Sequence, residues 1–397
     1  MKKLLIAVLC LMLTGCAAPA PSDGSGPDRS VSPDIPAPSP AASSAPNGES
    51  GPPQASPETD PETAENPSAS QEPSESSLGP QNQEQIIQEL LSAMTLEEKV
   101  GQMFFVRCPE TGGAELAAQY KVGGYLLFGR DFKDKTAQQV RDDIQSYQDA
   151  SGIPLLIGTD EEGGTVVRAS SNPDLFPQRE PAPQTLFAQG GMDLILQDAR
   201  QKSMTLLDLG VNVNFAPVAD VSTDPADFIY ARSFGQDAQA TANYVAQVVG
   251  VMGEEQIGSV LKHFPGYGNN VDTHTGIALD QRPYETFQTS DFLPFQAGIQ
   301  AGADAVLVSH NIAASMDESL PASLSPTVHK ILREELGFDG VVLTDDLAMD
   351  AVMEYAQNGS AAVLAIQAGN DMVVTTDFQT QIPQVIHAVQ SGVIAES

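Results

Sequence analysis

A short segment around residue 270 combines residue types that could move a proton and bind polar groups. Lys262 and His263 stand side by side at the end of an apolar run, and a glycine-rich turn follows them. Asp272 then lies two residues before a second histidine, His274. An imidazole titrates near neutral pH, and a neighbouring carboxylate can orient it and tune its pKa. The segment is therefore a candidate for acid/base chemistry.

A carboxylate at the end of another apolar run could supply a nucleophile. Asp345 follows the run 340–344, and its neighbour Asp346 should point the other way and act as a cap or support. The sequence has no phosphate loop, no Gly-x-Gly-x-x-Gly after its first strand and no Cys/His metal set, so we expect no cofactor and no metal. A proton donor and a carboxylate are what cleavage of a glycosidic bond requires.

These side chains need a rigid frame, and the sequence predicts eight buried strands. The apolar runs are continuous rather than alternating, as in strands that are buried on both faces. They are Met103–Val106, Gly124–Phe128, Pro154–Gly158, Val211–Phe215, Ser259–Lys262, Ala305–Val308, Gly340–Thr344 and Asp371–Thr375. Helical stretches separate them, one starting at the capping box of Thr95 and another closed by Gly369. The pattern predicts an α/β fold, a (β/α)8 TIM barrel, with a doubly wound open sheet as the alternative.

Polar residues gather at the ends of the predicted strands. They are Asp160 after the third strand, Lys262 and His263 at the fifth, Ser309 and His310 at the sixth, and Asp345 and Asp346 at the seventh. A single Asp after a strand is often only a helix N-cap. Because the strand ends of a barrel converge on the face that carries the active site, several such residues together indicate a site there.

Five segments together resemble glycoside hydrolase family 3. They are Asp160-Glu161-Glu162-Gly163-Gly164 with Arg168, Asn214 to Val218, Arg232-Ser233-Phe234-Gly235, Lys262 to Gly268 with Asp272-Thr273-His274, and Gly340 to Met349. Their order and spacing match the family from about residue 86 to residue 397. The motif with two histidines is similar to the β-N-acetylglucosaminidase branch rather than to the β-glucosidases.

The resemblance implies a role for each matching residue. In a retaining mechanism, Asp345 would be the nucleophile and His274 the acid/base, with Asp272 as its partner. The residues that would bind sugar hydroxyls are Asp160, Arg168, Arg232, Lys262 and His263.

Several polar residues have a structural interpretation as well. Lys262 and His263 could form a structural ion pair or a buried histidine contact, and Arg232 could simply pair with an acid. His310 could line the pocket or support the nucleophile. We expect Asp220 to be structural, and His329 and His387 to lie in helices away from the chemistry.

The match to the family has departures. Gly266-Tyr267-Gly268-Asn269 stands where the branch usually has Gly-His-Gly-Asp, and Thr165 follows the Gly-Gly pair where Arg is usual. The chain also ends at Ser397, where a last helix of the barrel should begin. Either the chain is truncated there or the barrel closes without that helix; we expect the barrel domain, 84–397, to be truncated at its last helix.

The amino-terminal part reads as an export signal and a tether. Residues 1–16 have a basic start, a short apolar run and a lipobox that ends at Cys16, which predicts a lipoprotein; an ordinary secretory signal is the alternative. Residues 17–83 are rich in Pro, Ser and Glu and predict a disordered linker. We thus expect an extracytoplasmic protein that is anchored to the cell membrane by lipid.

Composition limits the partners. A net charge of −33 argues against nucleic acid and against electrostatic docking on anionic lipid, so the lipid anchor would be the only membrane contact. Apart from Cys10 and Cys16 the chain has only Cys108, which excludes an internal disulfide and predicts a small core residue near a strand end. We expect a monomer that binds carbohydrate.

Four functions remain open on the sequence. The first is a retaining exo-β-N-acetylglucosaminidase that releases terminal GlcNAc from cell-wall fragments. The second is a glycoside phosphorylase, because a histidine acid/base does not repel phosphate as a carboxylate would. The third is another family 3 β-glycosidase, and the fourth is a muropeptide-binding lipoprotein without activity.

Overall fold

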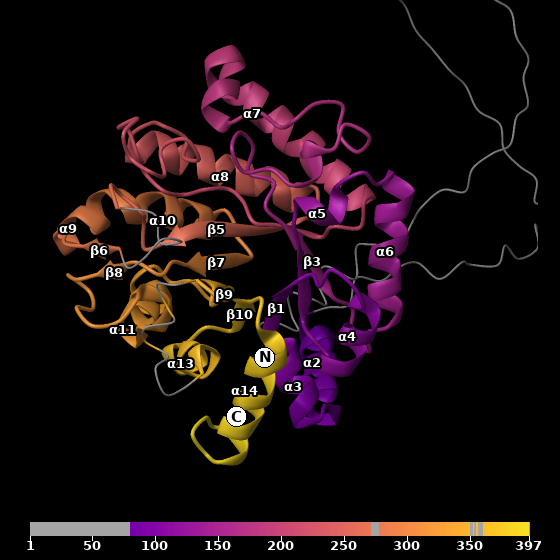
Figure 1. The fold of residues 1–397 in the computed structure, drawn as a ribbon. Coiled ribbons are helices and arrows are strands. Elements are labelled where there is room, and N and C mark those ends of the chain that lie inside the picture. Colours follow the sequence, from indigo (N-terminus) through magenta and orange to yellow (C-terminus); the bar gives the residue numbers. More distant parts are fainter. Residues whose placement is uncertain (1–79, 271–277, 350–351, 353–354, 356–359, 397) are drawn as a thin grey trace, which may run out of the picture. The chain divides into compact units, whose positions relative to one another are not determined.

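The barrel predicted from the sequence is present. The computed structural model describes residues 80–270, 278–349, 352, 355 and 360–396, and within this part eight parallel strands close into a barrel in the order β1-β2-β3-β4-β5-β7-β9-β10 (Figure 1). The strands are β1 Phe104–Arg107, β2 Gly124–Leu127, β3 Leu156–Thr159, β4 Val213–Asn214, β5 Gly258–Phe264, β7 Ala305–Val308, β9 Val341–Asp346 and β10 Met372–Thr375. Each of the eight predicted runs overlaps one of them, and the open-sheet alternative is wrong.

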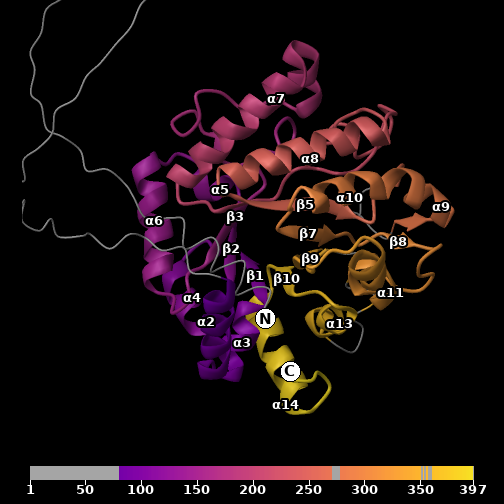
Figure 2. The same cartoon turned by 180° about the vertical axis from the view of Figure 1, so that it is seen from behind.

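Helices surround the barrel (Figure 2). Their bounds are α2 Pro80–Ala93, α3 Leu96–Gln102, α4 Gly113–Tyr120, α5 Gly129–Phe132, α6 Ala137–Asp149, α7 Pro183–Asp208, α8 Ala238–Glu254, α9 Tyr284–Thr286, α10 Phe292–Gln300, α11 Pro326–Lys330, α13 Ala361–Ala368 and α14 Phe378–Gln390. The capping box at Thr95 opens α3, and Gly369 closes α13 in the left-handed conformation, both as predicted. None of the described helices is long and apolar enough to span a membrane.

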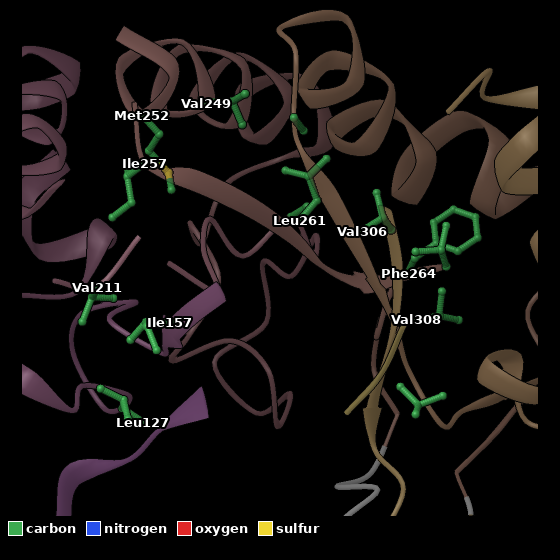
Figure 3. Packing of buried hydrophobic residues seen from close by; sticks show 14 of the residues in the cluster. Leu127, Ile157, Val211, Val249, Met252, Ile257, Leu261, Phe264, Val306 and Val308 are labelled. Atoms are coloured by element: carbon green, nitrogen blue, oxygen red, sulfur yellow. The ribbon is translucent and has the colours of Figure 1, made fainter. Parts of the chain in front are cut away.

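Two apolar cores explain why the strand sequences are continuous apolar runs. Successive side chains of a strand point to opposite faces, so Phe104 packs outward against helices and Phe105 packs inside the barrel. Leu261 and Val306 lie in the outer core, which Figure 3 shows between the strands and the helix that carries Val249. Cys108 is fully buried directly after β1, as expected.

Both ends of the barrel domain can be compared with the expectations. Helix α14, Phe378–Gln390, follows the last strand, and truncation of the domain at a last helix beyond it stays a prediction. Pro383 lies inside this helix, and its buried face, which includes Ile382 and Val385, packs against the core. Helix α2 begins at Pro80, inside the range predicted as linker; its Ile87 is buried. Cys16, the predicted signal and the part of the predicted tether before Pro80 lie outside the described residues.

Two glycines make room for the aromatic ring that fills the barrel near β1. A Cβ atom on Gly124 would lie 2.6 Å from the ring of Phe105, and one on Gly158 would lie 2.7 Å from it and 2.8 Å from Phe215. The rings of Phe105 and Phe215 are themselves in contact, with centroids 5.2 Å apart. Neither ring can move away freely, because both are enclosed by the strands.

We therefore predict that Gly158→Ala destabilises the fold. Overpacking of this kind costs roughly 1–3 kcal/mol, and urea unfolding should show the loss. Gly250→Ala is the matched control: Gly250 lies in α8, and a Cβ added there would meet no atom within 4 Å, so helix propensity should raise the free energy of unfolding by roughly 0.8–1 kcal/mol. Equal stability of the two variants would contradict this account of the barrel core.

Candidate active site

One cavity at the carboxyl ends of the strands collects most of the predicted site. It has a volume of about 290 Å³, and its floor includes the barrel residues Leu126, Phe215, Leu307 and Val374. Six of the eight residues predicted to be catalytic or to bind the sugar line it: Asp160, Arg168, Arg232, Lys262, His263 and Asp345. They come from several different strands or the loops that follow them, so the closed sheet is what brings them together.

Lys262 is held in the cavity wall by two carboxylates. Its Nζ lies 2.8 Å from Oδ1 of Asp160 and 2.5 Å from Oε1 of Glu162, and the residue is only 1% exposed. A buried ammonium group without such partners would lose its hydration with no compensation. The peptide bond between Lys262 and His263 is cis, and both side chains line the cavity.

Glu162 joins Lys262 to Arg232. Its carboxylate accepts hydrogen bonds from Nε of Arg232 at 3.0 Å and from Nη2 at 2.7 Å, in the bidentate geometry that suits a guanidinium. Burial by itself would raise the pKa of Glu162, but the charges of Lys262 and Arg232 outweigh it and hold this pKa well below its usual range. Burial would likewise lower the pKa of Arg232, and the charge of Glu162 raises it instead.

Sequence reasoning missed Glu162. It belongs to one of the family motifs, but the motif assigns it no role, although it lies two residues after Asp160. In an extended chain, residues at this spacing point the same way, so this spacing could have shown that both acids face the same lysine.

His263 presents a defined tautomer. Its Nδ1 lies 2.7 Å from Oδ2 of Asp220, and its Nε2 lies 3.0 Å from Nη2 of Arg232. A guanidinium can only donate, so Nε2 accepts and the ring proton lies on Nδ1, where it is donated to Asp220. Asp220 is fully buried and does not line the cavity, and it also accepts the backbone N–H groups of His263 and Tyr267. Its role is therefore to orient the neighbouring segment.

A second buried acid, Glu161, sets the path of the loop after β3. Its carboxylate accepts the backbone N–H groups of Arg168 at 2.9 Å and Ala169 at 2.7 Å, and the hydroxyl of Ser170. This holds Arg168 at the cavity, where its Nη2 donates to Oδ2 of Asp160 at 3.3 Å. No feature of the sequence pointed to Glu161 separately from its motif.

Asp345 lies near the end of β9, and its neighbours fix that strand end. Its Oδ1 accepts the backbone N–H of Asp346 at 2.8 Å. The carboxylate of Asp346 accepts hydrogen bonds from the N–H of Ala348 and the hydroxyl of Thr376, as expected of a supporting residue. Asp346 also lines the cavity, so the expectation that it points away from the side of Asp345 is wrong. His310 is buried outside the cavity with its Nε2 3.1 Å from the carbonyl of Asp346, so it supports the strand end that carries Asp345.

Asp272 and His274 lie outside the described residues. The chain on either side of them is well anchored: Nδ2 of Asn270 donates to Oδ2 of Asp280 at 2.7 Å, and Arg282 pairs with both Asp280 and Asp291. Burial raises the pKa of Asp291 to about 6, against the opposing charge of Arg282.

The remaining residues are placed as follows. Tyr267, where the sequence departs from the family, is buried, lines the cavity and packs edge-on against His263. His329 lies in α11 and His387 in α14, and neither lines the cavity. Within the part of the chain that the structure describes, no group of three or more His, Cys, Asp or Glu residues is placed to hold a metal ion.

We predict that Glu162→Gln costs about 3 kcal/mol of folding free energy, because it leaves Lys262 and Arg232 buried beside a neutral amide. The pH dependence gives a second check. Because the folded protein keeps Glu162 ionised, its contribution is complete above the unfolded pKa of about 4.5 and is lost progressively as the pH falls below it.

Chemical unfolding at several pH values between about 3 and 7 measures this. The stability difference between wild type and variant should shrink toward low pH. A difference that stays constant over this range would contradict the ionised state of Glu162. Asp339→Asn, an exposed acid at the other end of β9, controls for the loss of one negative charge.

Comparison with known proteins agrees with the fold and with the sequence motifs. Residues 95–397 match the family described as the glycosyl hydrolase family 3 N terminal domain. A β-hexosaminidase of Stenotrophomonas maltophilia is 36% identical over 291 residues, which cover 70% of this chain and 85% of that protein. A β-hexosaminidase of Xylella fastidiosa is 32% identical over 257 residues, covering 64% and 76% respectively.

Solved structures give the same result. A glycoside hydrolase family 3 β-N-acetylglucosaminidase from Paenibacillus sp. superposes with a TM-score of 0.69 at 30% identity, over 77% of this chain and 60% of that one. A family 3 glycosyl hydrolase from Mycobacterium smegmatis superposes with a TM-score of 0.68 at 30% identity, over 77% of this chain and 94% of that one. This chain therefore spans less than two thirds of the Paenibacillus structure and nearly all of the mycobacterial one. The protein belongs to glycoside hydrolase family 3.

Proposed function

We propose that this glycoside hydrolase is a retaining exo-β-N-acetylglucosaminidase that releases terminal, non-reducing GlcNAc from peptidoglycan fragments. The observation that carries the proposal is the shared cavity: Asp345 faces the same space as the five residues predicted to bind sugar hydroxyls. The relatives described as β-hexosaminidases and as a β-N-acetylglucosaminidase support the choice of sugar. The cavity, at about 290 Å³, lies at the small end of ligand pockets and suits a single sugar ring.

In the first step of this mechanism, a carboxylate oxygen of Asp345 attacks the anomeric carbon while the glycosidic bond breaks. His274 donates a proton to the leaving oxygen, and Asp272 stabilises the imidazolium before that transfer. In the second step His274 removes a proton from water, which attacks the same carbon and releases Asp345. Two inversions at one carbon give net retention.

The donors on the side of β4 and β5 would hold the sugar during both steps. Lys262 uses two of its three N–H groups on Asp160 and Glu162, and the third remains for a hydroxyl. Arg232 likewise has its Nε and Nη2 occupied by Glu162 and His263, which leaves Nη1 for the ligand. Because these cations are fixed by their acids before the sugar arrives, little reorganisation is needed on binding.

We predict that Asp345→Asn lowers kcat/KM for an aryl GlcNAc glycoside by at least about 1,000-fold, because the amide is a poor nucleophile. Turnover of the aryl glycoside in purified full-length protein measures this. Asp339→Asn, with the same change of charge on an exposed residue just before the same strand, should retain wild-type activity. Near-normal activity of Asp345→Asn would overturn the assignment of the nucleophile.

A product assay separates the remaining functions. Aryl glycosides of GlcNAc, glucose and xylose are compared with and without phosphate, and the products are followed by NMR. Free GlcNAc that appears first as the β anomer supports the retaining hydrolase. GlcNAc 1-phosphate would instead identify a phosphorylase, a preference for glucose or xylose another β-glycosidase, and binding without turnover a muropeptide-binding protein.

For the cellular location we propose that Cys16 carries the lipid anchor. The basis is the lipobox at the end of the apolar run. Cys16→Ser should move the protein from the membrane fraction to the soluble fraction and abolish incorporation of labelled fatty acid. A membrane-bound Cys16→Ser protein that carries no lipid would contradict the anchor.

A further inference from the structure

Arg107 differs from the other cations of the cavity in its surroundings. Lys262, Arg232 and Arg168 each pair with a carboxylate. Among the described residues, the side chain of Arg107 has neither an ion pair nor a hydrogen bond, and its Nε is buried without an acceptor. The chain has 52 acidic residues and only 19 basic ones, so an arginine left without an acid in a cavity wall is unexpected from composition.

A second arginine shares the same aromatic ring. The guanidinium carbon of Arg107 lies 4.3 Å from the ring centroid of Phe128, and that of Arg168 lies 5.1 Å from it. The Nε of Arg168 also lacks an acceptor, and its acid, Asp160, is shared with Lys262. The wall formed by Arg107, Phe128 and Arg168 therefore carries more positive charge than its acid neutralises.

The strand order shows which residues of the cavity lie on opposite sides of the barrel mouth. In the closed order of eight strands, β9, which carries Asp345, lies four strands from β3, which Asp160 follows. Strand β1, which carries Arg107, lies four strands from β5, which carries Lys262. Asp345 and Asp160 thus stand on opposite sides of the mouth, and so do Arg107 and Lys262. A sugar with C1 at Asp345 points C4 toward Asp160.

The handedness of the barrel then orients the sugar, if the proposed function holds. Right-handed crossovers make the strands run counter-clockwise when the barrel is viewed onto its carboxyl ends. A D-pyranose viewed from its β face is numbered clockwise, and this face is the one seen when the β-linked leaving group points out of the mouth. C2 and C3 then lie on the side of Lys262, and C5 and C6 lie on the side of Arg107.

We propose that the wall of Arg107, Phe128 and Arg168 recognises an oxyanion ester, a sulfate or a phosphate, on O6 of the terminal sugar; this rests on the proposed function. A tetrahedral oxyanion offers several charged acceptors to the two guanidinium groups, which bind such groups through paired N–H donors. A bare hydroxyl has no charge to offset that of Arg107.

The test compares wild type, Arg107→Met and Arg107→Lys on para-nitrophenyl GlcNAc and on the same glycoside with a sulfate or a phosphate on O6. We expect wild type to cleave one of the esters at least as efficiently as the plain glycoside. Arg107→Met should lower kcat/KM for that ester about 100-fold more than for the plain glycoside. Arg107→Lys keeps the positive charge but loses the paired N–H donors of the guanidinium. Its kcat/KM for the ester should lie between the values of wild type and Arg107→Met.

The control is Arg141→Met, which removes an arginine paired with Asp208 on the surface away from the cavity. It should leave the ratio of ester to plain glycoside unchanged. The two ester arms show whether sulfate or phosphate is the ligand. The inference is overturned if wild type prefers the plain glycoside over both esters by more than about tenfold, or if Arg107→Met lowers all three activities equally.

Failure of the proposed function gives a different result, namely no turnover of any glycoside by wild type. Calorimetric titration with GlcNAc, GlcNAc 6-sulfate and GlcNAc 6-phosphate then decides the anion site by itself. Tighter binding of an ester to wild type, lost in Arg107→Met, supports the site. Equal affinities for ester and GlcNAc overturn it.

Discussion

Glu162 is the charge on which the arrangement of the cavity wall depends. It lies between a lysine and an arginine that would otherwise repel each other in a place with little water. With Glu162 ionised, Lys262 and Arg232 become fixed donors, and Arg232 in turn fixes the tautomer of His263. One buried carboxylate thus determines the position of three groups that face the cavity. Such a wall is prepared before a sugar binds, which is the condition for strong electrostatic stabilisation of charge that develops in a reaction.

The barrel makes this network possible because it closes. Glu162 follows β3, Arg232 follows β4 and Lys262 lies in β5, so neighbouring strands deliver the three charges to the same edge. Asp345 lies on β9, across the barrel from β3. Barrel closure depends on side chains that fill the interior, and here the ring of Phe105 takes the space that two glycines leave open. Core packing closes the barrel, and the closed barrel in turn places the charges at its mouth.

The positive charge in the cavity is unevenly distributed. On the side of β4 and β5, Arg232 and Lys262 each have an acid, which leaves a nearly neutral surface with many donors. Such a surface suits the neutral hydroxyls of a sugar. On the other side, Arg107 and Arg168 flank Phe128; Arg168 shares Asp160 with Lys262, and Arg107 has no acid partner among the described residues. The two sides of a single cavity are thus suited to ligand groups of different charge.

The sequence by itself determined the strands, the face on which the site lies and the family. Buried parallel strands leave continuous apolar runs, and their polar ends mark the functional face, so local pattern suffices for these features. Helix α14 continues through Pro383 because its apolar face is buried, which is an effect of tertiary packing. Only the tertiary structure decided which polar side chains contact one another. Three such features depend on distances between residues that are far apart in the chain. Glu162 bridges Lys262 and Arg232, and His310 supports β9 from outside the cavity. Arg107 has no acid partner among the described residues. A residue's type limits what it can bind, but its partners are set by the closed sheet.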